Sequence, residues 1–343
     1  MNNVIPQHIA TFAPVRVCDV GGWTDTWFAQ TGSVCSIAIN RGVHVTIDTV
    51  PSTTTHIKFH VHNYQQTLSL DEARHHHPLL AVALDETPIP TGYAYTITID
   101  ADMPPGSSTG TSAAVSVALL AALAACNQTI VSAHTLAKQA HRLETVHLRQ
   151  QSGVQDQIGT AFGGANLITI TNYPETHVEH IDVGQAFVTA FNQQHVLFYY
   201  GKPHRSSDIH QQVIDRITRE QSGLRALEPM RQAALTAAIA LRAGDLRSFA
   251  ATLIRNTEAQ SQLHPDLVSA TARQIIDIAK RYDAWGWKVN GAGGDGGSIS
   301  LIASNNMQQR QLMRAHLAQE LPHVVCIDSE FCAHGVQVTL NAP

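Results

Sequence analysis

One stretch of the chain constrains its fold more than any other. Residues 104–127 read PPGSSTGTSAAVSVALLAALAACN, a glycine- and hydroxyl-rich loop that runs into a wholly apolar helix. Gly106 and Gly110 permit backbone angles that are closed to other residues, so the N–H groups between them can point into one concavity. A helix that begins at about Ala113 adds the positive end of its dipole and its unpaired first-turn donors. The loop is therefore typical of a phosphate site.

The loop also supplies hydroxyl groups for phosphate oxygens or for a hydrated Mg²⁺. They belong to Ser107, Ser108, Thr109, Thr111 and Ser112. Residues 94–104 predict a strand that leads into the loop, and the order strand, glycine loop, helix is the one that phosphate binding needs. The loop alone fits a capped core helix behind a polar turn equally well, because glycine-rich patterns have many false matches.

Size and charge narrow the class of protein. With 343 residues the chain exceeds what one hydrophobic core usually serves, so we expect two domains. Hydrophobic residues make up 44% and charged residues 14%, which predicts a globular fold. A formal net charge of −5 and the absence of a long Lys/Arg run argue against nucleic acid or a polybasic membrane patch. The same charge pattern favours a small-molecule partner. The longest apolar run, residues 113–126, is too short to span a bilayer, so a soluble protein is expected.

Three further features of the sequence predict a cytoplasmic protein with reduced thiols and without a histidine metal site. The five cysteines form no C-x-x-C pair, and we interpret them as buried, reduced thiols. The first residues lack the basic and apolar regions of a signal peptide. The run His75-His76-His77 has no Cys or carboxylate at metal-ligand spacing, so we predict a solvated loop there. The sequence leaves homodimer formation open.

Two acidic residues follow the apolar helix. Residues 132–150 predict a second helix, with Val146 in its apolar stripe and Glu144 at the edge of that stripe. Unless Glu144 is exposed, its carboxylate needs a metal ion, a basic partner or several donors. Asp156 comes twelve residues later. If the helix ends near Gln151, both acids can reach one cleft, where one would bind metal and the other act as a base, as is common in phosphoryl transfer.

Two further segments are candidates for ligand binding. Residues 21–26, GGWTDT, lie between two predicted strands and place Trp23, Thr24 and Asp25 side by side. Packing of the Trp23 ring and helix capping by Asp25 explain the same residues equally well. In residues 201–208, GKPHRSSD, basic residues including Arg205 precede a predicted helix start and invite an anionic group, although that segment alone favours helix capping with solvated charges.

A second glycine-rich segment lies near the C-terminal end of the sequence. Residues 287–304, WKVNGAGGDGGSISLIAS, match G-x-G-x-x-G through Gly291, Gly293 and Gly296. A dinucleotide fingerprint would lead into a helix, whereas residues 298–304 predict a strand, so we reject a Rossmann fold. A hairpin of two strands around a glycine loop is expected instead. The second half is otherwise helix-rich, with helices predicted over 207–221, 224–243, 245–263 and 267–282, followed by two closing strands in HVVCIDSEF and HGVQVTL.

Taken together, four segments resemble the GHMP kinase superfamily, named for galactokinase, homoserine, mevalonate and phosphomevalonate kinases. They are APVRVCDVGGWTD, PPGSSTGTSAA, GVQDQ and KVNGAGGDGG, in this order along the sequence. GGWTDT, GVQDQ with AFGGAN, and FYYGKPHRSSDI are most similar to its heptose kinase and fucokinase branch, which phosphorylates sugars at the anomeric hydroxyl. The resemblance implies an α+β fold. Residues 1–182 would form an ATP-binding domain like ribosomal protein S5 domain 2, and residues 183–343 a ferredoxin-like domain with extra helices, with the active site between them.

The resemblance also implies roles for individual residues. Asp156 would be the catalytic base, Arg16 would orient it or stabilise the transferring phosphoryl group, and Ser112 with Glu144 would bind Mg²⁺. The residues around the ATP phosphates would be Pro104, Gly106, Ser107, Ser108, Thr109, Gly110, Thr111 and Ser112. The residues that hold the sugar would be Gly22, Trp23, Thr24, Asp25, Arg205 and Gly293, with Arg205 meeting a phosphate on the sugar.

Three departures from the family pattern qualify these roles. GGWTD replaces the GEHTD of galactokinases, Ser108-Thr109 stands where the family often has Gly-Leu, and Asp295 occupies a usual glycine position and is expected to point away from ATP. The sequence thus predicts an ATP- and Mg²⁺-dependent sugar kinase, a phosphotransferase with an alcohol acceptor, that converts D-glycero-D-manno-heptose 7-phosphate to the 1,7-bisphosphate. The alternatives are a free-sugar kinase of fucokinase type and a non-catalytic sugar or nucleotide sensor on the same fold.

Overall fold

The structure is a computed structural model that describes residues 5–201, 207–219 and 223–341. Within these ranges, eight strands form one mostly antiparallel sheet, ordered β12-β1-β2-β5-β3-β4 with β6 and β7 branching from β2. The strands are β1 (His8–Val20), β2 (Gly32–Pro51), β3 (His56–Val61), β4 (Gln66–Ser69), β5 (Tyr93–Ala101), β6 (Ala165–Asn172), β7 (Glu175–Ile181) and β12 (Gln337–Asn341).

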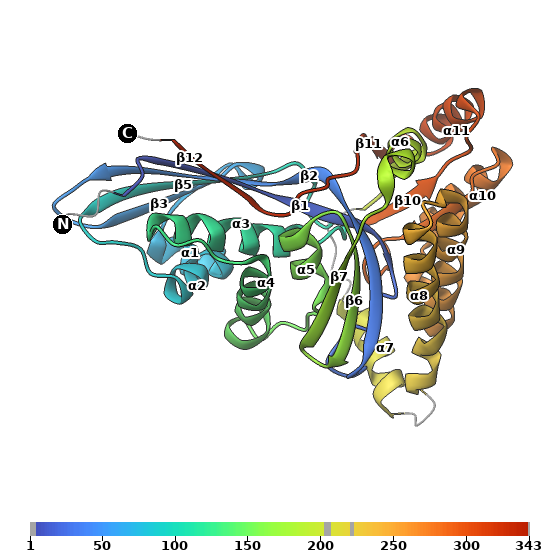
Figure 1. Ribbon diagram of the computed structural model, residues 1–343, viewed down its shortest axis with the longest axis horizontal. Coiled ribbons are helices and arrows are strands. Elements are labelled where there is room, and N and C mark those ends of the chain that lie inside the picture. The colour runs from blue at the N-terminus through green and yellow to red at the C-terminus, as the bar shows by residue number, and fades with distance from the viewer. Residues whose placement is uncertain (1–4, 202–206, 220–222, 342–343) are drawn as a thin grey trace.

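Helices cover one face of this large sheet (Figure 1). They are α1 (Leu70–His76), α2 (Pro78–Glu86), α3 (Thr111–Cys126), α4 (Ala133–Arg142), the π-helical turn η2 (Leu143–His147) and α5 (Gln155–Phe162), with the 3₁₀ turn η1 (His62–Tyr64) in the β3–β4 connection. Helix α3 lies centrally because its side chains are apolar on every side and nearly all of them are buried. Its first turn thereby fixes the glycine loop against the sheet.

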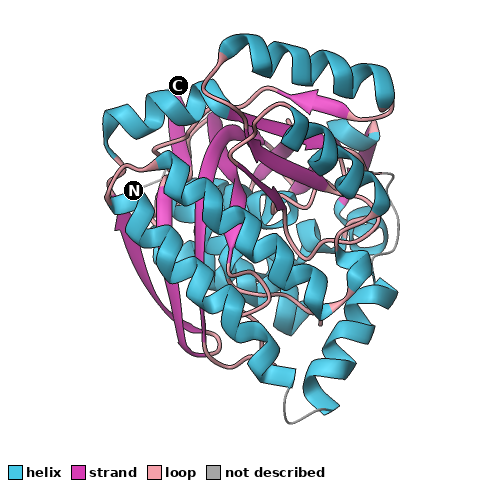
Figure 2. Cartoon of the chain, turned by 90° about the vertical axis from the view of Figure 1, so that its right-hand side faces the viewer, coloured by secondary structure: helices cyan, strands magenta, loops and turns pink. Residues whose placement is uncertain are grey.

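A second sheet and a stack of helices form the other half. The strands, in the order β11-β8-β10-β9, are β8 (His195–Tyr199), β9 (Gly286–Val289), β10 (Ser298–Ile302) and β11 (Val325–Ile327). The helices are α6 (Gly184–Gln194), α7 (Ser207–Arg219), η3 (Gly223–Leu227), α8 (Glu228–Arg242), α9 (Leu246–Leu263), η4 (Pro265–Leu267), α10 (Ala270–Arg281) and α11 (Met307–Glu320). Viewed from this half, the helices stand in front of the strands (Figure 2). The predicted α+β class is confirmed.

The two halves share a core. Strand β12 follows the second sheet in sequence but pairs with β1 of the first, and α8 packs on β2. One buried apolar cluster contains residues of both halves, including Val17, Leu123 and Phe249. None of the described helices combines the length and the apolar character needed to cross a membrane.

Several local predictions were wrong, for identifiable reasons. A capping box between Ser69 and Glu72 starts α1, so His75 and His76 lie on a helix and not in a loop. The helix predicted over 132–150 changes to π-helical hydrogen bonding after Arg142 and ends soon afterwards, which turns Val146 outward to 61% exposure.

Helix ends and thiols also differ from expectation. Helix α3 begins at Thr111, two residues earlier than expected, because Gly110 takes the left-handed conformation immediately before it. The regular part of the helix predicted from residue 224 begins at Glu228, next to Pro229, after a 3₁₀ turn. Cys326 is exposed because β11 is an edge strand, and Cys332 is only half-buried, so these two cysteines are not core thiols.

Candidate active site

The glycine loop between β5 and α3 has the backbone that its sequence predicts. Gly106, Ser108 and Gly110 all have positive φ angles, of 75°, 59° and 78°. The hydroxyls of Ser107 and Thr109 lie inside the loop, 2.8 Å apart, where they stabilise its shape. Ser112 is exposed at the start of α3, and Ser108 and Thr111 are partly exposed. The outward-facing hydroxyls and the first N–H groups of α3 thus remain available to an anion.

The second glycine-rich segment, residues 287–304, packs against the glycine loop. The hydroxyl of Ser298 donates to the carbonyl of Ser107 at 2.6 Å. Gly297 approaches the loop so closely that a Cβ there would lie 2.7 Å from the hydroxyl of Ser108. Asp295 is exposed on the far part of the hairpin. The predicted hairpin β9–β10 therefore fixes the loop's conformation through direct contact.

Arg16 connects the loop to Asp156. Its Nε and Nη2 atoms donate to Oδ1 of Asp156 at 2.8 and 2.7 Å, and Nη1 donates to the carbonyl of Ser108 at 2.7 Å. Burial alone would lower the pKa of Arg16, but the carboxylates of Asp156 and Asp19 outweigh it and raise that pKa. Asp156 lies in the first turn of α5 with its side chain 32% exposed. Gly110 makes this approach possible, because a Cβ there would lie 3.3 Å from the Asp156 side chain.

Sequence reasoning missed a buried ion pair behind Arg16. Both Asp19 oxygens accept from the N–H of Gly291 at 3.0 Å, and Lys288 Nζ lies 3.7 Å from Oδ2. Asp19 and Lys288 are fully buried, and desolvation lowers the pKa of Lys288 although Asp19 opposes this shift. Their signal in the sequence was isolated charges within apolar strands, Arg16 and Asp19 in β1 and Lys288 in β9. The pair links β1 to the second glycine-rich segment.

Glu144 is buried beside the loop. Its Oε2 accepts hydrogen bonds from Ser152 Oγ and Gln157 Nε2, both at 2.7 Å, and its Oε1 faces Ser112 Oγ at 3.5 Å. Burial raises the pKa of Glu144 to about 7, with a further contribution from the Asp156 carboxylate. Ser152 and Gln157 therefore supply the hydrogen-bond donors that a buried carboxylate at this position was expected to need.

The residues around Glu144 fit a magnesium ion. A carboxylate oxygen and a serine hydroxyl are the hard oxygen ligands that Mg²⁺ prefers, and Mg²⁺ often takes only one or two protein ligands beside phosphates and waters. Over the described ranges, no group of three or more His, Cys, Asp or Glu side chains could hold a metal by itself. Ser112 and Glu144 therefore suit a cation that arrives with a phosphate ligand, and not a permanently bound one.

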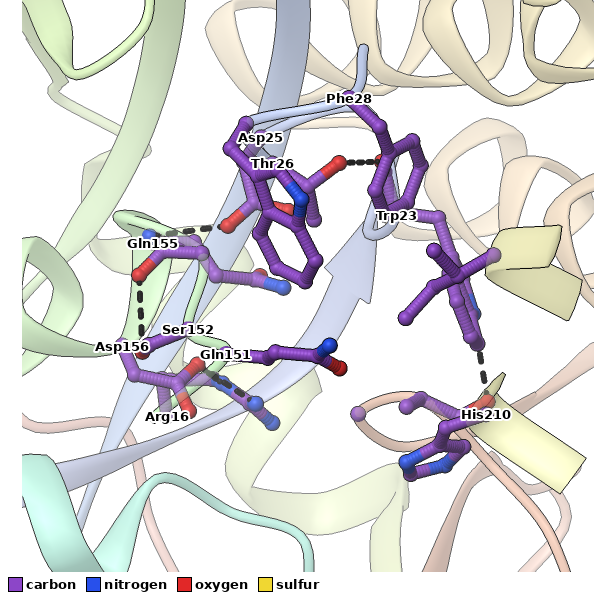
Figure 3. A pocket seen from close by; sticks show the side chains of 15 residues that line it. Arg16, Trp23, Asp25, Thr26, Phe28, Gln151, Ser152, Gln155, Asp156 and His210 are labelled. Carbon is purple, nitrogen blue, oxygen red and sulfur yellow. Dashed lines mark hydrogen bonds and ion pairs between the residues drawn. The ribbon is translucent and has the colours of Figure 1, made fainter. Parts of the chain in front are cut away.

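A cavity of about 230 Å³ opens in front of Asp156 (Figure 3). One wall is aromatic, and most of the rest is polar, with the acidic residues Asp25 and Asp156 and the basic residues Arg16 and His210. The lining residues are Arg16, Trp23, Asp25, Thr26, Trp27, Phe28, Gln151, Ser152, Gly153, Gln155, Asp156, His210, Ile214, Gly291 and Ala292. An aromatic wall opposite carboxylates and amides suits a polyhydroxylated ring, since the aromatic face packs on C–H groups while the polar groups bind hydroxyls.

The predicted sugar residues divide into two groups. Trp23 and Asp25 line the cavity, and Trp23 is fixed by a hydrogen bond from Nε1 to the carbonyl of Ala292. Gly22, Thr24 and Gly293 are not among the lining residues. The hydroxyl of Thr24 donates to the backbone of the turn, and the two glycines allow close packing against buried neighbours. Arg205 lies outside the described residues.

A second cavity of about 350 Å³ lies on the other side of the glycine loop. It is lined by Met103, Gly106, Thr111, Ser112 and Val115 near the loop, and by Tyr64, His76 and His77 among the residues farther out. Its largely apolar walls suit a flat ring system that need not be fully hydrogen-bonded. The glycine loop is thus flanked by one cavity with acids and one with apolar walls.

Asp25 gives the site a testable pH dependence. Burial raises the pKa of its carboxyl from 3.8 to about 6, although the N–H of Gln155 donates to it. Because the folded protein then holds a proton that the unfolded chain has lost, the free energy of unfolding falls as the pH rises from about 4 to about 6. Asp25→Asn removes this effect. We expect the variant to be more stable than the wild type by about 2 kcal/mol at pH 8 and by little at pH 4.

Urea unfolding at both pH values measures this difference. Asp277→Asn is the control, because this carboxylate is exposed on α10 and its partner Lys280 keeps its charge at both pH values; it should change stability little at either pH. Equal stability of Asp25→Asn and the wild type at pH 8 would contradict the expected cost of the buried charge.

Fold and site together define the class, an α+β protein with a phosphate-type glycine loop at the start of a buried helix. Residues 78–164 match the family model described as the GHMP kinases N terminal domain, which confirms the predicted resemblance over this segment.

Among curated proteins, the chain is similar to the D-glycero-alpha-D-manno-heptose 7-phosphate kinase of Campylobacter jejuni, with 24% identity over 195 residues. The match spans 57% of this chain and 57% of that relative's length.

Solved structures extend the similarity to nearly the whole chain. A D-glycero-D-manno-heptose 1-phosphate kinase from Bacteriodes thetaiotaomicron superposes with a TM-score of 0.75 at 20% identity, covering 98% of this chain and 100% of that one. A Lactococcus lactis galactokinase complexed with galactose gives a TM-score of 0.75 at 15% identity, covering 96% and 95%. At these identities the structural likeness establishes the fold.

Proposed function

We propose that the protein is an ATP- and Mg²⁺-dependent kinase that phosphorylates the anomeric hydroxyl of a sugar. The observation that carries this proposal is the position of Arg16, which bonds to Asp156 with one edge of its guanidinium and to the glycine loop with the other. A single rigid side chain thereby fixes the distance between a carboxylate and a phosphate-type loop. Fixed geometry of this kind is what phosphoryl transfer requires of a protein.

The nucleotide would occupy the glycine loop and the apolar cavity beside it. Its phosphates would lie against the backbone from Gly106 to Ser112, with its base in the cavity next to Met103 and Val115. Ser112 and Glu144 would hold Mg²⁺, which when bound offsets the negative charge that repels an attacking hydroxyl. Ser107 and Thr109 would act indirectly, through the shape of the loop.

The acceptor sugar would occupy the cavity at Asp156. Its anomeric hydroxyl would give its proton to Asp156 as the new O–P bond forms. Arg16 bonds to Oδ1, so Oδ2 is the oxygen left for that proton. Asp25 would accept hydrogen bonds from ring hydroxyls, and Trp23 would pack on the face of the ring.

We propose D-glycero-D-manno-heptose 7-phosphate as the acceptor. The Campylobacter jejuni relative is named for this activity, and the sequence around GGWTDT and GVQDQ resembles the same branch. Arg205 would meet the phosphate on the sugar.

A free sugar is the second candidate, for a specific reason. The basic residues in the described lining of the cavity are Arg16 and His210, and Arg16 is already bonded to Asp156 and Ser108. Binding the phosphate group of a phosphorylated sugar therefore depends on His210 or on residues outside the described ranges. A neutral sugar needs no positively charged partner in the cavity.

ADP release with a heptose 7-phosphate and with the same heptose lacking the phosphate separates these candidates. We expect kcat/KM to be at least about tenfold higher for the phosphorylated sugar, since a charge-assisted pair is worth about 1.5–3 kcal/mol. Arg205→Ala should remove most of that preference without affecting the free sugar. Equal kcat/KM for the two sugars would favour the free-sugar kinase. Binding of ATP or sugar without ADP release in the presence of any sugar would favour a sensor.

A further inference from the structure

The two carboxylate oxygens of Glu144 have different surroundings. Oε2 accepts two short hydrogen bonds, from Ser152 and Gln157, and these two donors also lie 3.2 Å from each other. Oε1 points toward the hydroxyl of Ser112, at the longer distance of 3.5 Å. One oxygen is thus held tightly by the protein, while the other faces the glycine loop.

The donor Ser152 is itself held from outside. It lies in the irregular segment between η2 and α5, and its carbonyl accepts a 2.9 Å hydrogen bond from the hydroxyl of Tyr173. Tyr173 follows β6, and its Oη is 2.8 Å from Nε2 of His141, a buried residue of α4. Because the Tyr173 hydroxyl has one hydrogen and donates it to Ser152, Nε2 of His141 must be the donor to Tyr173. The contacts therefore run continuously from α4 to Glu144.

We propose that Gln157 and Ser152, with Tyr173 behind them, are positioning residues for the metal carboxylate. They hold Oε2 so that Oε1 and the Ser112 hydroxyl face the loop together, where the cation carried by the nucleotide would bind. This inference rests on the proposed function, because it assigns the Ser112 and Glu144 pair to Mg²⁺.

The physical reason is preorganisation. A carboxylate that rotates freely loses that freedom each time a cation binds, whereas Glu144 has already lost it on folding. Outer residues that orient metal ligands typically change metal affinity or activity by 10–100-fold when replaced. If Gln157 and Ser152 served only to satisfy a buried carboxylate, their loss would lower stability and leave metal affinity unchanged. The two roles therefore make different predictions.

The test measures Mn²⁺ binding in the presence of ATP by electron paramagnetic resonance, without sugar or turnover. We expect Gln157→Met, which keeps the length of the buried side chain, to weaken Mn²⁺ binding by about 10–100-fold. Tyr173→Phe removes one oxygen atom and should weaken it less, by a few-fold. ATP binding without metal should be unchanged in both, and the Mg²⁺ concentration for half-maximal activity should rise in the same order.

Tyr282→Phe is a matched control. Tyr282, which directly follows α10, makes the same kind of contact with His316 of α11 in the other half, with an Oη to Nδ1 distance of 2.9 Å and edge-on rings. This variant should bind Mn²⁺ as the wild type does.

Wild-type Mn²⁺ affinity in both Gln157→Met and Tyr173→Phe would overturn the inference. If Gln157→Met fails to fold, Tyr173→Phe decides alone. A wild-type protein that binds Mn²⁺ with ATP but releases no ADP with any sugar would refute the kinase and leave the positioning role standing. Absence of Mn²⁺ binding by the wild type in the presence of ATP would refute both the proposed kinase function and the positioning role.

Discussion

Replacing Asp156 with asparagine is expected to lower kcat by about 10²–10⁴-fold, the usual contribution of a positioned base. Asparagine keeps an oxygen that can accept from Arg16 but cannot take a proton. The contact of Arg16 with the loop carbonyl of Ser108 should therefore survive. ATP should bind with nearly unchanged affinity. Steady-state ADP release and calorimetric titration with ATP measure the two quantities.

The control for this substitution is Asp277→Asn, which removes an exposed carboxylate on α10 that pairs with Lys280. It should leave kcat and ATP affinity unchanged. Asp156→Asn with full activity would remove the assignment of Asp156 as the base. A variant that loses ATP binding as well would indicate that Asp156 mainly holds the loop.

Replacing Arg16 with glutamine is expected to affect both stability and catalysis. The side chain is 3% exposed, and its loss leaves Asp156 without this cation and leaves Asp19 with Lys288 as its basic partner. Removing one member of a buried ion pair typically costs about 3–5 kcal/mol. We expect a cost of about 3 kcal/mol here, because Lys288 still faces Asp19 and the Asp156 side chain is 32% exposed. The orientation of Asp156 relative to the loop is lost too, so kcat should fall by at least about 100-fold.

Arg242→Gln is the matched control, since Arg242 forms two hydrogen bonds to Glu179 on the exposed surface. Exposed pairs contribute about 0–1 kcal/mol, so urea unfolding should separate the two variants clearly. Arg16→Lys should recover part of the stability but little of the rate, because lysine cannot donate to Asp156 and Ser108 in the same planar arrangement. Equal destabilisation by Arg16→Gln and Arg242→Gln would contradict this view of the site.

Features encoded by adjacent residues were predictable from the sequence. The strand before the glycine loop, the apolar helix after it and the β9–β10 hairpin each depend on local periodicity or on glycines at positive φ. The expectation that Glu144 and Asp156 approach one cleft also came from local reasoning. Both lie beside the glycine loop, Glu144 facing Ser112 and Asp156 lying against Gly110.

Features that depend on distant contacts were not predictable. The Asp19 and Lys288 pair joins residues that are more than two hundred and fifty positions apart, and isolated charges in two strands gave no reason to pair them. The π-helical turn that carries Glu144 has no signal in side-chain periodicity, which is why Val146 was placed on the wrong face. Thr24 was grouped with its neighbours, although its hydroxyl closes the turn that presents Trp23 and Asp25.

Strand β12 has a consequence for how this protein is made. His8 in β1 is in register with Asn341 in β12, so two partners in one ladder are separated by more than three hundred residues. During synthesis, the outer edge of residues 8–12 therefore stays unpaired until residues 337–341 have emerged, and unpaired edges recruit other strands. Arg16 lies farther along β1, where the strand pairs with β2. Closure of this sheet edge thus depends on late, long-range pairing, which is intrinsically slow, while the strand segment that carries Arg16 can pair early.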